Sequence, residues 1–275
     1  MRADQETYTH GHAPSVLRSH TARTVANSAA YVAHRLVPGA DVLDVGCGPG
    51  TISLDIAERV APGRVLAIDS AEAPLADARA RAAGIDTITF AVGDAYALDV
   101  PDDSMDVVHA HQVLQHLTDP VAALREMLRA CRPDGIVAVR DADYAAMTWY
   151  PADPRLDRWL AVYRAVARSS GAQPDAGRHL LAWTRAAGAA TVTPTASVWC
   201  YATPADRAWW GGLWADRIVE SAIAGRAVDG GHADAAELRG ISEAWRAWSE
   251  HPDGWFAVLH GEVLARPAQP GRDRP

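Results

Sequence analysis

The chain has 275 residues, of which 49% are apolar and 22% charged, and its net charge is −8. This length can bury a full core, and this composition is typical of a globular protein rather than a disordered one. All 26 basic residues are arginines scattered among acidic residues, which disfavours a nucleic-acid partner and excludes chemistry that needs a lysine, such as a Schiff base or a P-loop.

Strand and helix patterns alternate through the first half of the chain. A helix is predicted at 15–36 and is ended by Pro38-Gly39. Beyond it we predict strands at 42–45, 64–68, 87–92, 105–110 and 136–139, with helices at 52–60, 74–83 and 119–130. Alternation with short connections implies right-handed βαβ units and a parallel sheet covered on both faces.

The pattern changes after about residue 148. Helices are predicted at 156–169, 178–187, 205–225 and 233–250, and strands at 191–201 and 255–265. All ten tryptophans lie at or beyond Trp149. The 3-4-3 spacing of Leu238, Ile241, Trp245 and Trp248 indicates one buried helix stripe. As an alternative to core packing, some tryptophans, with Trp149, Trp209 and Trp210 as candidates, could line a ligand pocket, where aromatic rings supply rigid apolar contact.

The segment Asp41–Thr51 is the most informative part of the chain. A short apolar strand carrying Asp44 runs into three alternating glycines, Gly46, Gly48 and Gly50, and then into a helix. Glycines suit a sharp turn or a close approach of a ligand to the main chain, and a helix N-terminus offers free N–H groups. Position 51 is Thr, where a dinucleotide fingerprint has its third glycine.

Four further motifs follow in order, each at a strand end or a turn: Val65–Asp69, Val92–Ala95, Met105–His111 and Leu128–Gly135. With the glycine loop, they resemble the class I S-adenosylmethionine-dependent methyltransferases, most closely the ubiquinone/menaquinone-biosynthesis-type group (methyltransferase domain 11/25-like). The resemblance covers residues 40–140. It implies an α/β, Rossmann-like, doubly wound, mostly parallel seven-stranded sheet with helical additions, and S-adenosylmethionine as cofactor.

The resemblance divides the chain into an N-terminal helical lid at 1–38, a cofactor-binding core at 39–148, and acceptor-side helices with the last strands at 149–265. Residues 266–275 are expected to form a disordered tail. The helical additions are the lid and an insertion before the last strand.

The resemblance implies cofactor contacts at the carboxyl ends of the strands. They are expected from Asp44, Gly46, Cys47, Gly48, Asp69, Ser70, Gly93, Asp94, Ala95, His111 and Gln112. Asp69 would accept from the ribose hydroxyls and Asp94 from the adenine amino group, while Asp44 is equally a loop-bracing carboxylate. From the lid, Tyr8 and Arg23 are expected near the carboxylate end of the cofactor.

Candidate catalytic residues follow the fourth and fifth strands. Arg140 is a candidate to hold an acidic acceptor group or to pair with Asp141, and Asp141, Asp143 or Tyr144 to orient or deprotonate the acceptor. His116 is a second candidate base. His109 and His111 share a strand face, but methyl transfer from a sulfonium needs no metal, and none is expected.

The leading function is therefore methyl transfer by in-line displacement to a small-molecule acceptor, at carbon, nitrogen or oxygen. Alternatives are an enzyme using the cofactor without methyl transfer, a binding module without catalysis, or a nicotinamide oxidoreductase, which Thr51 and the Asp94 motif disfavour. We expect a monomer or homodimer. No apolar run reaches the ~18 residues of a membrane span, the start of the chain shows no secretion signal and the three cysteines are far apart, so a cytoplasmic location is expected.

Overall fold

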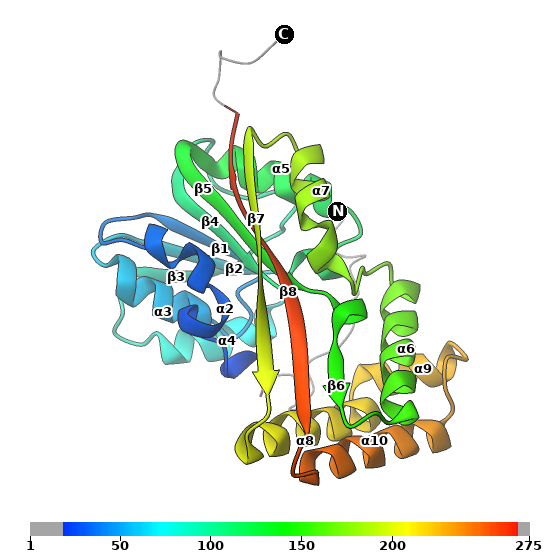
Figure 1. Ribbon diagram of the computed structural model, residues 1–275. Coiled ribbons are helices and arrows are strands. Elements are labelled where there is room, and N and C mark those ends of the chain that lie inside the picture. The colour runs from blue at the N-terminus through cyan, green and yellow to red at the C-terminus, as the bar shows by residue number, and fades with distance from the viewer. Residues whose placement is uncertain (1–18, 269–275) are drawn as a thin grey trace.

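The computed structural model describes residues 19–268 (Figure 1). Its central sheet begins with five parallel strands in the order β3-β2-β1-β4-β5. These are β1 (Val42–Val45), β2 (Val65–Asp69), β3 (Ile88–Val92), β4 (Met105–His111) and β5 (Cys131–Ala142). From β1 the chain adds β2 and β3 on one side, and it then returns to add β4 and β5 on the other side. Open α/β sheets form a ligand crevice at such a point, which here lies between β1 and β4.

The sheet is completed by strands from the end of the chain. β8 (Trp255–Arg266) runs antiparallel to β5, and β7 (Thr191–Tyr201) pairs antiparallel with β8 along its whole length. The short strand β6 (Thr148–Tyr150) also pairs with β8 and makes the sheet eight-stranded where seven strands were predicted. Three residues are too few for a visible period-two pattern, so β6 escaped sequence analysis.

Helices cover both faces of the parallel strands. The core on one face joins the sheet to the N-terminal helices and to α3 (Thr51–Val60) and α4 (Glu72–Arg81). The core on the other face joins it to α5 (Pro120–Ala130) and to α7 (Leu180–Ala186), which follows the 3-10 turn η5 (Ala176–His179). This is the expected doubly wound arrangement.

A third core lies where the far ends of β6, β7 and β8 meet four helices (Figure 1). The helices are α6 (Pro154–Ser169), α8 (Pro204–Glu220), α9 (Ala222–Asp229) and α10 (Ala235–Glu250). Trp159 lies at the centre, with its ring 4.6 Å from that of Trp214 and 4.8 Å from that of Trp245. The helical insertion predicted before the last strand is α8–α10, between β7 and β8.

Two predicted helices are interrupted. The helix expected at 15–36 is divided into a helical stretch at 19–21, α2 (Val25–Ser28) and the 3-10 helix η2 (Ala30–Arg35), and its first residues lie outside the described part of the chain. Thr24 caps α2 in a capping box with Asn27. Ser221 likewise ends the predicted helix 205–225 and caps α9. The sequence signal for both breaks was a Thr or Ser, which are preferred N-cap residues, inside an otherwise continuous apolar pattern.

Candidate active site

The glycine loop links β1 to α3 and needs its glycines for different reasons. Gly46, Gly48 and Gly50 have φ values of 70°, 54° and 75°. A Cβ on Gly46 would overlap the Val113 side chain, and one on Gly50 would lie 2.7 Å from Phe90. At Gly48 the nearest atom to such a Cβ is 3.9 Å away, in the His20 ring. The main chain therefore bends tightly and stays open on the side that faces the cavity described below.

Asp44 braces this loop from below. Its buried carboxylate accepts from Ser53 Oγ at 2.5 Å and from His109 Nδ1 at 2.8 Å. One oxygen thus anchors α3 and the other anchors β4, which is the loop-bracing role left open by the sequence. Burial and the carboxylates of Asp44 and Asp69 raise the pKa of the neighbouring Cys47 thiol, so this thiol stays protonated.

Two acids follow the ends of neighbouring strands. Asp69 accepts from the N–H of Gly48 at 2.9 Å and from the N–H of Ala71 at 3.0 Å, so it ties the glycine loop to the end of β2. Asp94 accepts from the N–H of Tyr96 at 2.9 Å and so also caps a turn. Both acids line the cavity, where their carboxylates are hydrogen-bond acceptors.

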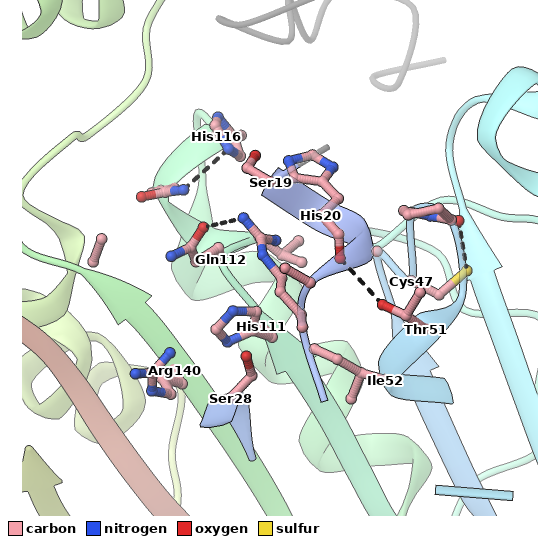
Figure 2. A pocket seen from close by; sticks show the side chains of 18 of the residues that line it. Ser19, His20, Ser28, Cys47, Thr51, Ile52, His111, Gln112, His116 and Arg140 are labelled. Carbon is pink, nitrogen blue, oxygen red and sulfur yellow. Dashed lines mark hydrogen bonds between the residues drawn. The ribbon is translucent and has the colours of Figure 1, made fainter. Parts of the chain in front are cut away.

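The segment from Ser19 to Ser28 lies over the cavity and is tied to it at several points. Thr51 Oγ1 donates to the His20 carbonyl at 3.1 Å (Figure 2). The Arg23 guanidinium donates to Gln112 Oε1 at 2.7 Å, and Trp199 Nε1 donates to the Asn27 carbonyl at 2.6 Å. Arg23 lines the cavity, and its expected contact with the carboxylate end of the cofactor stays a prediction. Tyr8, the other lid residue, lies outside the described residues.

Gln112 connects Arg23 to His260 on β8. Its Nε2 lies 2.9 Å from His260 Nε2, and His260 Nδ1 lies 3.1 Å from the Val258 carbonyl. The hydrogen bonds are consistent if His260 is neutral and donates from Nδ1, and burial together with the Arg140 charge lowers its pKa well below the ordinary value. Gln112 has a φ of 55°, a left-handed conformation that ends β4 abruptly.

Arg140, at the end of β5, pairs with a residue that the sequence did not identify. Its Nε lies 3.2 Å from Glu262 Oε1, and Ser197 Oγ lies between Nε and Nη2 at 3.2 and 3.1 Å. Glu262 also accepts from the hydroxyls of Thr195 and Ser197. The predicted pairing of Arg140 with Asp141 is therefore wrong: Arg140 and Glu262 are register partners across β5 and β8.

The other catalytic candidates separate into two groups. His116 and Tyr144 line the cavity, but burial lowers the pKa of His116 to about 3 and raises that of Tyr144. Asp141 does not line it, because strand alternation turns its side chain away from that of Arg140, and it accepts instead from the N–H of Gln115. Asp143 is bound by Arg178 at 2.6 Å.

The glycine loop, Asp69, Asp94 and Arg140 all line one cavity of about 750 Å³. Every predicted cofactor-binding residue within 19–268 lines it, as do His116, Arg140 and Tyr144. Its second half is walled by side chains that the sequence left unassigned or only suggested: Met147, Ser197, Trp199, Tyr201, Trp209, Trp210, Arg217, Val258 and Glu262. Trp149 is absent from this wall because it stacks on Phe256, 5.6 Å away, in the helical core. Trp199 was missed because only the β7–β8 pairing turns it inward.

Among residues 19–268, no group of three or more His, Cys, Asp or Glu side chains is arranged to hold a metal ion. No helix in this range is long and apolar enough to cross a membrane.

Comparison with known proteins agrees with this geometry. The family described as "Methyltransferase domain" matches residues 36–187. An uncharacterized methyltransferase of Schizosaccharomyces pombe is 32% identical over 271 residues, covering 95% of this chain and 96% of that protein. A probable methyltransferase of Aspergillus luteorubrus is 26% identical over 94% of this chain and 96% of its own length.

Solved structures share the fold. The YcgJ protein of Bacillus subtilis aligns with a TM-score of 0.57 at 19% identity, over 88% of this chain and 98% of its own. The [4+2]-cyclase SpnF aligns with a TM-score of 0.53 at 24% identity, over 87% and 80%. The chain belongs to the class I S-adenosylmethionine-dependent methyltransferases, and S-adenosylmethionine is its cofactor.

Proposed function

We propose that this protein methylates a small, largely aromatic or apolar acceptor that binds in the tryptophan-walled half of the cavity. The observation that supports this most is the continuity of the cavity, in which strand-end acids and open glycine backbone meet Trp199, Trp209 and Trp210 without a dividing wall. Aromatic side chains of this kind supply rigid apolar contact to flat ligands.

The residues at the strand ends fit the cofactor. Asp69 is proposed to accept from the ribose hydroxyls, since it lines the cavity at the end of β2 and a carboxylate is a hydrogen-bond acceptor. Gly48 leaves the main chain accessible to the amino-acid part of the cofactor, and Asp94 with Ala95 offers polar contacts to the base. Arg23, held by Gln112, is placed to bind a carboxylate from the roof.

S-adenosylmethionine supplies a methyl group on a positively charged sulfur. The protein's contribution is to align the acceptor with that group and to exclude water, because charge is dispersed during the displacement. The contacts of Ser19–Ser28 with Gln112, Thr51 and Trp199 close the roof over the reacting groups. A pKa of about 3 makes His116 a weak base, which favours alignment over general-base catalysis at neutral pH.

Binding and product analysis test this proposal together. Isothermal titration with S-adenosylhomocysteine should show saturable binding, and NADH should not bind. Incubation with S-adenosylmethionine and a library of aromatic acceptors should yield S-adenosylhomocysteine and a product 14 mass units heavier. Methylthioadenosine in place of S-adenosylhomocysteine would instead indicate the alternative, use of the cofactor without methyl transfer.

We also propose a simple assembly and no nucleic-acid partner. A monomer or homodimer is expected, and sedimentation velocity distinguishes them. A short DNA or RNA duplex added to the titration should not bind, since the net charge is −8.

A further inference from the structure

Arg140 carries a donor that the described protein does not use. Its side chain is only 1% exposed, and its Nε and Nη2 are occupied by Glu262 and Ser197. Nη1 is buried and has no hydrogen-bond partner among residues 19–268. A buried guanidinium N–H without an acceptor is costly, so such a group in a cavity wall points to a ligand.

His111 presents a second unused polar group beside it. Both ring nitrogens are buried and without partners in the same part of the chain. His111 and Arg140 are register partners on β4 and β5, so their side chains leave the sheet on the same face and both line the cavity (Figure 2). The Trp199 ring links them: its centroid lies 5.7 Å from that of His111 and 4.8 Å from the Arg140 guanidinium carbon.

The electrostatic surroundings favour a negative ligand. Burial, followed by the charges of Arg23 and Arg140, lowers the pKa of His111 well below its ordinary value, so His111 is neutral and offers one N–H. The Arg140 pKa falls only to about 10, so Arg140 stays charged at neutral pH. Glu262 is already engaged by Thr195, Ser197 and Arg140, and it holds the guanidinium through Nε, while Nη1 has no partner among residues 19–268.

We infer that Arg140 Nη1 and the His111 N–H form a carboxylate subsite, and that the acceptor is a flat aromatic acid whose ring packs against Trp199. Two donors from neighbouring strands match the two oxygens of a carboxylate. This inference rests on the proposed function, since it assigns the chemical class of the acceptor that the same cavity takes.

The test measures acceptor binding apart from cofactor binding. Protein saturated with S-adenosylhomocysteine is titrated with 1-naphthoate and with its neutral analogue 1-naphthamide. Naphthoate should bind about tenfold or more tightly than naphthamide, as one charge-assisted contact implies. Equal affinities, or no binding of naphthoate, would overturn the carboxylate subsite.

The variant removes the donor without leaving a buried charge. Arg140→Met/Glu262→Gln should abolish the preference for naphthoate while the dissociation constant for S-adenosylhomocysteine changes less than threefold. The control Arg246→Met/Asp216→Asn, which removes a surface pair with an N–O distance of 3.0 Å, should keep the preference. His111→Phe provides a second removal of a donor, should the double variant fail to fold.

The possible failures are distinguishable. Loss of S-adenosylhomocysteine binding in the Arg140 variant would place Arg140 on the cofactor and refute the inference. Absence of S-adenosylhomocysteine binding in the wild type would refute the proposed function instead. A preference for naphthoate that persists in both variants would assign the carboxylate to other groups.

Discussion

Replacing Asp69 by Asn tests the cofactor half of the site most directly. Each carboxylate oxygen of Asp69 accepts one backbone N–H, from Gly48 at 2.9 Å and from Ala71 at 3.0 Å. In Asn one oxygen becomes an amide donor, so one of these bonds is lost and a charge-assisted contact to ribose becomes a weaker neutral one. Contacts of that kind are worth roughly 1.5–3 kcal/mol, which corresponds to an affinity loss of about 10- to 100-fold.

The assay is isothermal titration of S-adenosylhomocysteine into Asp69→Asn, with urea unfolding of the same sample to confirm that it is folded. Asp77→Asn on α4 is the matched control, because Asp77 is exposed and does not line the cavity. The control should bind like the wild type. A folded Asp69→Asn protein with an affinity within twofold of the wild type would show that Asp69 only ties the loop to β2, and the ribose assignment would fail.

Three further changes probe the loop, the helical core and a buried acid. Gly46→Ala forces alanine into a φ of 70° and its Cβ against Val113, so the free energy of unfolding measured in urea should fall by more than roughly 1–2 kcal/mol. Adding Val113→Ala should restore part of this loss, and strictly additive effects of the two substitutions would contradict the clash. Trp159→Ala should cost about 3–5 kcal/mol by the same measurement, because Trp159 is fully buried among aromatic rings; a loss under 1 kcal/mol would show that the core collapses around the gap. Burial raises the pKa of Asp141 to about 7, so between roughly pH 4 and 7 the folded protein holds a proton that the unfolded chain has released, and stability falls as pH rises. This decrease in the free energy of unfolding amounts to up to about 4 kcal/mol, and Asp141→Asn should abolish it. Equal slopes of unfolding free energy against pH for the two proteins would refute this account.

The strand ends were predictable because each carries a local signal. An apolar run that stops at an acid or a glycine marks both the strand and its carboxyl end, and parallel strands bring those ends together whatever their order. Asp69, Asp94 and His111 could therefore be placed in one crevice before any contact was known. The breaks at Thr24 and Ser221 were missed because an apolar pattern that continues across a cap looks like one helix.

The acceptor half was not predictable in the same way, because its key partners come from antiparallel pairing. Arg140 meets Glu262 across β5 and β8, and Glu262 meets Thr195 across β8 and β7, so three segments far apart in the sequence must be placed in register first. A shift of one residue would turn Glu262 to the opposite face of the sheet and leave the Arg140 charge buried without its carboxylate. The register of β8 therefore determines both the stability of this wall and the orientation of the Arg140 guanidinium, and through the proposed carboxylate subsite it would couple the last strand of the fold to acceptor recognition.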